Sequence, residues 1–228
     1  HSFPTRRSSD LTAFAALTFI KDGMLIGLGG GTTIGTLAKF ITEKQLAVKV
    51  VTPSFETEKL CVRLGLPLLP LRMVSHVDVA FDGCDEIDRH LHALKSGGGI
   101  HTREKLIAHM ADEYILMATE DKLSDTLRFT CPIVLELLED SYAYVKRRVE
   151  ELKGSFHPRT SDGKFGLLMS DHGNVLADVR FPNVQDSVQL NQELKKIAGV
   201  IDTSLLTEEV TKALIGKEDD FLLLEKEV

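Results

Sequence analysis

Cysteine is scarce in this chain, with three residues among 228, and the scarcity excludes a fold held together by disulfide bonds. The three residues, Cys61, Cys84 and Cys131, lie far apart in the sequence. No two of them have the spacing of a zinc finger or of a redox Cys-x-x-Cys motif. We therefore expect reduced thiols in a cytoplasmic protein.

Positive charge is also short, because 27 Lys and Arg stand against 34 Asp and Glu and leave a net charge of −7. A chain without a basic excess is poorly suited to nucleic acid or to an anionic membrane surface, and we expect neither as a partner. The composition, with 43% hydrophobic and 27% charged residues, excludes a disordered or collagen-like chain. The length suits one large domain, or a large domain that carries a smaller one.

Long apolar runs are missing as well. The run Leu11–Ile20 comes after two arginines and imitates a signal peptide, but it is too short to span a bilayer and has no small-residue cleavage site. We expect a helix here, with Asp10 as its N-cap. Residues 1–10 lack an initiator Met and look unrelated to the rest of the chain, so we expect a non-native N-terminal segment.

Short apolar runs alternate with helical patterns through the first half of the chain. The patterns predict strands at 24–28, 48–51, 77–81, 91–95 and 114–118, and helices at 34–43, 54–64 and 102–111. Strands that alternate with helices and lack polar alternation predict a mainly parallel, Rossmann-like α/β sheet.

The pattern changes after Cys131. It predicts strands at 133–136, 155–159, 165–169, 175–179 and 200–206, and helices at 140–153 and 184–198. This β-α-β-β-α-β order is the split βαβ pattern of a ferredoxin-like α+β domain. We therefore predict a main α/β domain at 11–130 and 206–228, which would hold the catalytic site, and a small α+β domain at 131–205.

Three unusual loops come directly after predicted strands, and in an open α/β sheet ligands bind beyond the carboxyl ends of the strands. The first loop, residues 27–33, reads Gly-Leu-Gly-Gly-Gly-Thr-Thr, and its glycines and helix-start N–H groups suit a phosphate. It lacks the third glycine of the dinucleotide motif and the Gly-Lys-Ser/Thr of a P-loop. A tight turn without a ligand is the alternative.

The second and third loops contain charged side chains. Asp82-Gly-Cys-Asp-Glu86 places three carboxylates within five residues, and their mutual repulsion can raise a pKa and suit acid–base chemistry. An acidic surface turn is the alternative. Lys95-Ser-Gly-Gly-Gly99, with Thr102-Arg-Glu-Lys105 close behind it, indicates a second anion-binding nest. Its Glu104 also fits the simpler role of a helix N-terminal acid.

Other reactive residues give weaker signals. Cys84 lies between carboxylates that disfavour a thiolate, so we expect a packing residue and not a nucleophile. His90 and His92 lack a third ligand at useful spacing, and we expect no metal site. The sequence contains neither a G-x-S-x-G nor an H-E-x-x-H motif.

Taken together, the loops resemble the ribose-5-phosphate isomerase type A family. Asp82-Gly-Cys-Asp-Glu-Ile, Lys95-Ser-Gly-Gly-Gly and Thr102-Arg-Glu-Lys are similar, at the same spacing, to that family's D-G-A-D-E, K-G-G-G and R-E-K motifs. The first loop resembles its G-x-G-T-G-S-T loop, and Glu120-Asp121-Lys122 resembles its lysine segment. The resemblance extends from about residue 11 to the end of the chain.

The resemblance implies interconversion of D-ribose 5-phosphate and D-ribulose 5-phosphate in the non-oxidative pentose phosphate pathway, without metal or cofactor, by a homodimer or homotetramer. It implies that Glu104 moves a proton between C2 and C1 through an enediolate and that Asp82 assists ring opening. It also implies that Asp85 and Lys95 orient the hydroxyl groups of the sugar and stabilise the developing oxyanion. The substrate-binding residues that it implies are Gly30, Gly31, Thr32, Thr33, Gly83, Cys84, Ser96, Gly97, Gly98 and Lys122.

The chain departs from the family pattern in four places. Gly30 replaces a threonine, Thr32 replaces a serine, Ser96 replaces a glycine, and Ser8-Ser9-Asp10 stand where the family has a phosphate-binding lysine. A non-catalytic sugar-phosphate sensor of the same fold group is the main alternative, although the sequence has no helix-turn-helix pattern and no basic face. A relative of the CoA transferases or of the amino-sugar-phosphate deaminases is the third possibility.

Overall fold

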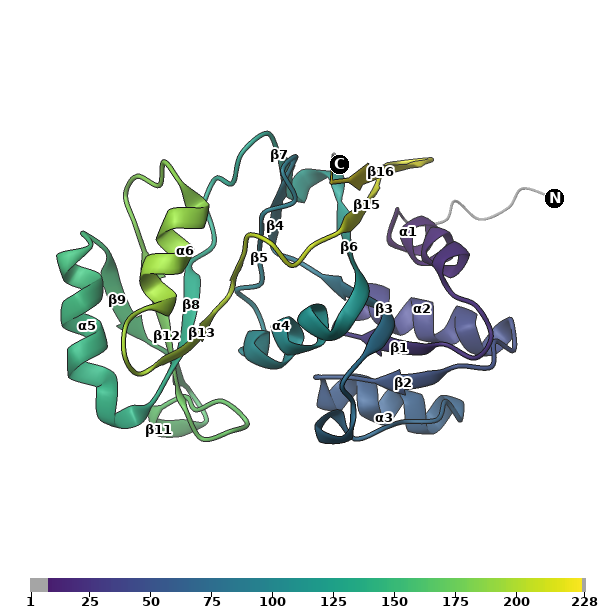
Figure 1. Ribbon diagram of the computed structural model, residues 1–228, viewed down its shortest axis with the longest axis horizontal. Coiled ribbons are helices and arrows are strands. Elements are labelled where there is room, and N and C mark those ends of the chain that lie inside the picture. The colour runs from purple at the N-terminus through teal and green to yellow at the C-terminus, as the bar shows by residue number, and fades with distance from the viewer. Residues whose placement is uncertain (1–7, 227–228) are drawn as a thin grey trace.

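The central element is a six-stranded sheet, which lies at the right of Figure 1. The computed structural model describes residues 8–226. Five neighbouring strands run parallel, and the sixth, β16, pairs antiparallel with β15. In spatial order the strands are β16 (Phe221–Glu225), β15 (Lys212–Gly216), β6 (Ala111–Thr119), β3 (Val77–Gly83), β1 (Leu25–Leu28) and β2 (Lys49–Val51). The predicted mainly parallel α/β sheet is confirmed.

Helices cover both faces of this sheet (Figure 1). On one face, Leu37 and Cys61 pack into a core with Phe81 of β3. On the other face, Ile107 packs into a second core with Tyr114 of β6. The helices of the first face are α1 (Ser8–Ala16), α2 (Thr32–Glu43) and α3 (Phe55–Leu64), and the helix of the second face is α4 (His101–Met110).

Local signals explain where α3 begins and ends. The hydroxyl of Ser54 accepts a hydrogen bond from the N–H of Thr57 at 3.3 Å, which caps the helix start. Gly65 has a φ of 70°, the left-handed conformation that ends many helices and that glycine adopts without strain. The predicted helix at 54–64 is confirmed.

The start of α1 differs from the prediction. The helix begins at Ser8, so Asp10 lies in its first turn and is not the N-cap. A carboxylate in the first turn is favourable beside the positive end of the helix dipole, which explains why Asp10 fits there. The first seven residues of the predicted non-native segment lie outside the described residues.

A second, antiparallel sheet lies at the left of Figure 1 and forms, with two helices, a small α+β region. Its core contains Val145 and Leu194 from the helices and Leu135 and Ala177 from the strands. In spatial order its strands are β13 (Val200–Thr203), β8 (Ile133–Leu137), β12 (Val175–Arg180) and β9 (Ser155–Pro158), and its helices are α5 (Tyr142–Glu151) and α6 (Ser187–Lys195). The β-α-β-β-α-β order agrees with the predicted elements, whereas the domain boundaries at 131 and 205 stay a prediction.

A third sheet, which the sequence did not predict as a separate sheet, joins the two regions, and the strand predicted at 91–95 for the main sheet belongs to it. Its strands are β14 (Leu205–Leu206), β5 (Ala93–Leu94), β4 (Glu86–Asp88) and β7 (Leu123–Ser124). The single strand predicted at 200–206 is wrong, because the chain leaves one sheet and enters another at Ser204. Ser204 itself bonds to Val134 through its N–H and to Lys95 through its carbonyl.

Shorter elements complete the described chain. A hairpin of β10 (Thr160–Ser161) and β11 (Lys164–Leu167) extends from the small α+β region. Single turns of 3-10 helix lie at Leu17–Phe19, Leu71–Met73, Glu120–Lys122 and Glu139–Ser141. Within residues 8–226, no helix is both long and apolar enough to cross a membrane.

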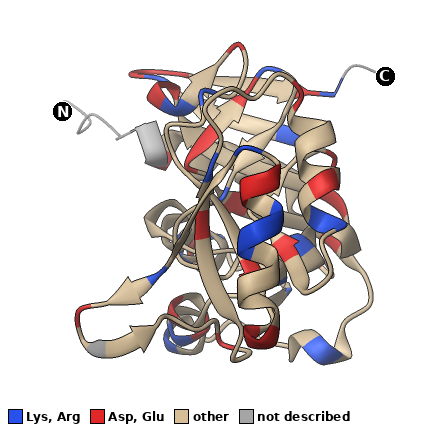
Figure 2. Ribbon diagram, turned by 90° about the vertical axis from the view of Figure 1, so that its left-hand side faces the viewer, with Lys and Arg blue, Asp and Glu red and all other residues tan. Residues whose placement is uncertain are grey.

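Charges of both signs are mixed on the face that α5 presents in Figure 2. Arg147 and Arg148 each pair with Glu151, and Lys146 lies 4.0 Å from Glu150. Such exposed pairs contribute little to stability, but they keep this face of the small α+β region from having one sign of charge.

Lys105 ties α4 to the junction between β13 and β14. Its ammonium is fully buried and donates to Asp202 Oδ1 and to the carbonyls of Thr203 and Leu205, each at 3.0 Å. Glu209 Oε1 lies 3.5 Å away. The helix that contains Glu104 is thereby fastened to the end of the small α+β region.

We predict that Lys105→Met lowers the free energy of unfolding by about 3–5 kcal/mol, because it leaves buried carboxylates and carbonyls without their donor. Urea denaturation monitored by circular dichroism measures the loss. The control is Lys146→Met on the exposed surface of α5, which should change stability by less than about 0.5 kcal/mol. Equal stability of the two variants would contradict the assigned role of Lys105.

Candidate active site

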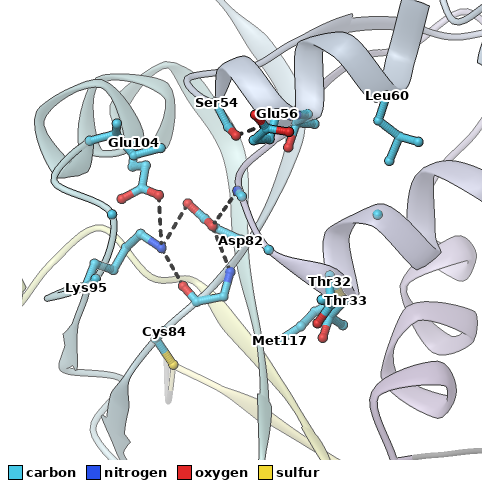
Figure 3. Close-up of a pocket in the computed structure, with 18 of the residues that line it drawn as sticks. Thr32, Thr33, Ser54, Glu56, Leu60, Asp82, Cys84, Lys95, Glu104 and Met117 are labelled. Carbon is cyan, nitrogen blue, oxygen red and sulfur yellow. Dashed lines mark hydrogen bonds and ion pairs between the residues drawn. The ribbon is translucent and has the colours of Figure 1, made fainter. Parts of the chain in front are cut away.

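The three predicted loops meet at one open cleft of about 970 Å³, beyond the carboxyl ends of β1 and β3 (Figure 3). Parallel strands bring their carboxyl ends to the same edge of a sheet, which explains why loops far apart in the sequence converge. Every predicted site residue except Ser96 lines this cleft. The predicted residues that line it are Gly30, Gly31, Thr32, Thr33, Asp82, Gly83, Cys84, Asp85, Lys95, Gly97, Gly98, Glu104 and Lys122.

Asp82, near the end of β3, is buried beside the first glycine loop. Its Oδ1 accepts hydrogen bonds from the N–H groups of Gly83 at 2.8 Å and Gly30 at 3.3 Å. A Cβ added to Gly29 would lie 2.1 Å from the carboxylate, so only glycine fits at that position. One function of the glycine loop is therefore to let the Asp82 carboxylate approach the backbone.

Lys95 lies between two carboxylates (Figure 3). Its Nζ is 3.1 Å from Asp82 Oδ2 and 3.4 Å from Glu104 Oε1, and it donates to the Gly83 carbonyl at 2.5 Å. Burial by itself would lower the pKa of Lys95, but the two carboxylates raise it above its usual range. Lys95 is therefore a buried ammonium in the wall of the cleft.

Glu104, in the first turn of α4, is the carboxylate with the altered acidity. Burial and the neighbouring charge of Asp82 raise the pKa of Glu104 to about 8, against the opposing effect of Lys95. Its Oε2 is buried and has no hydrogen-bond partner among the described residues. A carboxylate with a pKa near neutrality and a free oxygen is suited to act as a general base.

The acidic loop does not behave as one group. Glu86, the third of its carboxylates, is buried and accepts hydrogen bonds from the Thr130 hydroxyl and from the N–H groups of Arg128, Phe129 and Cys131. Burial alone would raise the pKa of Glu86, but these bonds lower it. The expected repulsion within the loop is therefore relieved at Glu86, which holds β4 to the segment 128–131.

Two further charged residues of the cleft, Asp85 and Lys122, hold its loops together. Asp85 is half-buried, and its Oδ2 accepts from the N–H of Gly97 at 2.9 Å. Lys122 Nζ donates to the Cys84 carbonyl at 2.7 Å. The thiol of Cys84 points away from Lys95 in Figure 3, in agreement with the predicted packing role.

The start of α2 is open to an anion. Gly31, with a φ of 95°, precedes the helix, and no side chain among the described residues caps its first N–H groups. Thr32 and Thr33 line the cleft at this point. Uncapped N–H groups beside hydroxyls are a suitable site for a phosphate.

Ser96, the predicted residue outside the lining, faces the small α+β region. Its hydroxyl donates to the Pro132 carbonyl at 2.5 Å, and its own carbonyl accepts from Arg159 Nη2 at 2.5 Å. Arg159 in turn pairs with Asp178 at 2.6 Å. The side chain at position 96 therefore fastens the third loop without entering the cleft.

The comparisons with known proteins agree on one family. The model of the family described as ribose 5-phosphate isomerase A (phosphoriboisomerase A) matches residues 49–220. The chain belongs to this family. Ribose-5-phosphate isomerase A of Methanococcus aeolicus is 38% identical over 216 residues, which cover 92% of each chain.

Solved structures of ribose 5-phosphate isomerases have the same fold. That of ribose 5-phosphate isomerase A from Methanocaldococcus jannaschii superposes with a TM-score of 0.88 at 35% identity, over 96% of this chain and 98% of the other. A D-ribose-5-phosphate isomerase in complex with phospho-erythronic acid superposes with a TM-score of 0.90 at 29% identity, over 96% and 97% of the chains.

The cleft has further charged residues that lie outside the family's motifs and that sequence reasoning missed. Lys39 of α2 and Arg63 of α3 line it and are exposed. A signal was present for Lys39, because Thr32, Thr36 and Lys39 recur at the spacing of one helix face. Arg63 gave no such signal, because only the packing of α3 beside α2 brings it to the cleft.

The small α+β region also contributes to the lining of this isomerase-family cleft. Asp171 lies between β11 and β12, lines the cleft and forms an ion pair with Arg103, the neighbour of Glu104. Thr102 donates to the buried Glu136 of β8 at 2.5 Å. Neither contact could be predicted from the sequence, because both join segments more than 30 residues apart.

Two groups of side chains among the described residues are close enough together to hold a metal ion, and neither lines the cleft. In one of them Lys105 lies 3.5 Å from Glu209, and its positive charge opposes a bound cation. The groups are His76, Asp78 and Asp112, and His109, Glu208 and Glu209.

We predict that iodoacetamide at pH 8 modifies Cys131 before Cys84 or Cys61 in the native protein. Burial raises the pKa of Cys84 to about 12 and that of Cys61 to about 11, and both thiols are covered, whereas Cys131 is half-buried. Mass spectrometry of timed digests gives the order of modification. Equal rates at Cys84 and Cys131 would show instead that the Cys84 thiol is reactive in the folded protein.

Proposed function

We propose that this chain catalyses the interconversion of D-ribose 5-phosphate and D-ribulose 5-phosphate. The observation that supports this proposal most directly is the Lys95 ammonium between Asp82 and Glu104, beside the unpartnered Oε2 of Glu104. An aldose–ketose shift requires one base near two adjacent carbons and one electrophile for the oxygen that becomes charged. Relatives named ribose-5-phosphate isomerase A, and a solved D-ribose-5-phosphate isomerase in complex with phospho-erythronic acid, support the choice of substrate.

Glu104 is the proposed base for the proton transfer. In the open-chain aldose its carboxylate takes the proton from C2, and the electron pair left on C2 forms the C1=C2 double bond of an enediolate. Glu104 then returns the proton to C1, while the O2 proton moves to O1 and a C2 carbonyl forms. One carboxylate thus serves as base and then as acid, which suits a pKa near neutrality.

Lys95 is the proposed electrophile. Negative charge develops on O1 when the C2 proton leaves, and a buried ammonium at the cleft stabilises that charge. Asp82 fixes the position of Lys95, and its predicted part in ring opening stays a prediction. Asp85, half-buried and lining the same cleft, is the proposed acceptor for a sugar hydroxyl.

The phosphate is proposed to bind at the start of α2. There the uncapped N–H groups and the hydroxyls of Thr32 and Thr33 offer donors, and Lys122 lines the same cleft. Lys39 and Arg63 add positive charge to the cleft in a chain that lacks the family's N-terminal lysine. An overall negative protein can therefore bind one phosphate through a local site.

The sensor alternative is weaker than the isomerase proposal. A binding module needs donors for the phosphate but has no need of a buried base with a raised pKa beside an ammonium. The free thiols of Cys61, Cys84 and Cys131 support the proposal of a cytoplasmic location. A homodimer or homotetramer stays the prediction made from the family resemblance.

We predict that Glu104→Gln lowers kcat for ribose 5-phosphate by about 100- to 10,000-fold, because the amide keeps the shape of the side chain but cannot accept the C2 proton. A coupled assay for ribulose 5-phosphate measures the rate. Glu58→Gln on the exposed surface of α3 is the matched control and should leave kcat unchanged. Equal rates for wild type and Glu104→Gln would exclude Glu104 as the base.

Solvent exchange separates an isomerase from a sensor. In deuterium oxide, the wild type should exchange the proton at C1 or C2 of the sugar phosphate, as read by proton NMR, and Glu104→Gln should not. Binding of ribose 5-phosphate without any exchange would favour the sensor.

The pH profile should show the raised pKa of Glu104. Because the base must be ionised, kcat/KM should fall about tenfold per pH unit below about pH 8 as the free enzyme takes up the proton. A second change near pH 6 is expected from the substrate phosphate itself and should also occur in binding measurements. An acid limb that begins only near pH 4.5, the ordinary value for glutamate, would contradict the raised pKa.

A further inference from the structure

Tyr114 of β6 is a buried tyrosine whose hydroxyl reaches the active-site carboxylate. Its side chain is 1% exposed and packs in the core between the sheet and α4, together with Ile107. The hydroxyl donates to Asp82 Oδ2 at 3.1 Å. The backbone of Tyr114 is held as well, because its N–H and its carbonyl both bond to Thr211. A phenol in this place does more than fill the core, since phenylalanine would fill the same volume.

This hydroxyl completes the partners of Asp82. Oδ1 accepts from the N–H groups of Gly30 and Gly83, and Oδ2 accepts from Tyr114 and lies 3.1 Å from Lys95 Nζ. A carboxylate offers about four lone-pair positions, so these four donors occupy them all. Two of these donors are backbone N–H groups and one is the buried Tyr114 hydroxyl, whereas Lys95 is the one charged side chain among the four.

We propose that Tyr114 is a positioning residue, whose hydroxyl holds Asp82 Oδ2 in place while Lys95 turns its charge to the substrate oxygen. The proposal rests on the proposed isomerase function. When Lys95 moves toward the developing oxyanion, Asp82 Oδ2 would otherwise be a buried charge without a donor, which is costly. With Tyr114 present, Asp82 retains three hydrogen-bond donors and keeps its position relative to the Lys95 ammonium.

Tyr114 is suited to this role because it remains a donor at every working pH. Burial, and after it the charges of Asp82 and Glu104, raises the pKa of Tyr114 well above its usual value. The ionisable groups around its hydroxyl are Asp82 at the end of β3, Cys84 in the adjoining loop, Lys95, and Glu104 of α4. Of these, Glu104 is the group whose pKa lies near neutrality. The loss of the Tyr114 hydroxyl should therefore be detected as a shift in the pKa of Glu104.

The test is Tyr114→Phe, which removes one oxygen and keeps the ring. We expect kcat for ribose 5-phosphate to fall about tenfold or more, the factor for one hydrogen bond to a charged group, with KM changed less than about threefold. The acid limb of kcat/KM should move to higher pH, because the Asp82 charge is then less compensated and strengthens proton binding at Glu104. Unchanged kcat and an unchanged limb would overturn the proposal.

A readout without turnover separates this proposal from the proposed function. The carboxyl carbon of Glu104, assigned in ¹³C NMR with Glu104→Gln, should titrate at higher pH in Tyr114→Phe than in the wild type, even if the protein has no isomerase activity. An identical midpoint in the two proteins would show that the hydroxyl does not act on the carboxylates. An inactive wild type with a shifted midpoint would instead refute the isomerase function alone.

The matched control is Tyr142→Phe, which removes a tyrosine hydroxyl from the small α+β region, where the ring packs against Phe156. It should leave kcat, the pH profile and the Glu104 midpoint unchanged. If Tyr114→Phe proves unfolded by circular dichroism, Tyr114→Met in the same two measurements replaces it, because a flexible apolar side chain fills the site without a donor. An unshifted Glu104 midpoint in folded Tyr114→Met would likewise overturn the proposal.

Discussion

The buried ammonium of Lys95 is the interaction on which the rest of the site depends. A charge removed from water is costly unless opposite charges and hydrogen-bond acceptors surround it. Here Asp82, Glu104 and the Gly83 carbonyl do so, and they come from the end of β3 and from α4. The end of β3, the third loop and the start of α4 are therefore held in one arrangement, and Gly29 has to lack a side chain for Asp82 to reach its place.

The small α+β region has a structural part in the same arrangement. Arg159 bonds to the carbonyl of Ser96, next to Lys95, Glu136 accepts from the first turn of α4, and Asp202 pairs with the buried Lys105. The segment that contains Lys95 and Glu104 is thus held by the main sheet on one side and by the small α+β region on the other. A base and an ammonium must be positioned precisely, which explains why the main sheet and the small α+β region both support this site.

The sequence predicted most of the fold because its main elements have strong local signals. Apolar strands and capped helices, such as the one that begins after Ser54, are read from the residues themselves. Of the third sheet the sequence predicted only the strand at 91–95, because the other strands are two or three residues long and β14 and β7 pair with distant segments. The strand predicted at 200–206 was wrong for the same reason, since the change of sheet at Ser204 depends on bonds to Val134 and Lys95.

The sequence by itself determined the family motifs, the sheet and the loops that would meet at its edge, because these depend on periodicity and on residue type. Only the tertiary structure decided what each carboxylate does. Glu104 acquired the raised pKa, Glu86 became a structural acceptor, and Asp82 gained a donor from Tyr114, which no motif indicated. Acidity depends on burial and on charges a few ångströms away, and those neighbours come from segments that the linear sequence keeps apart.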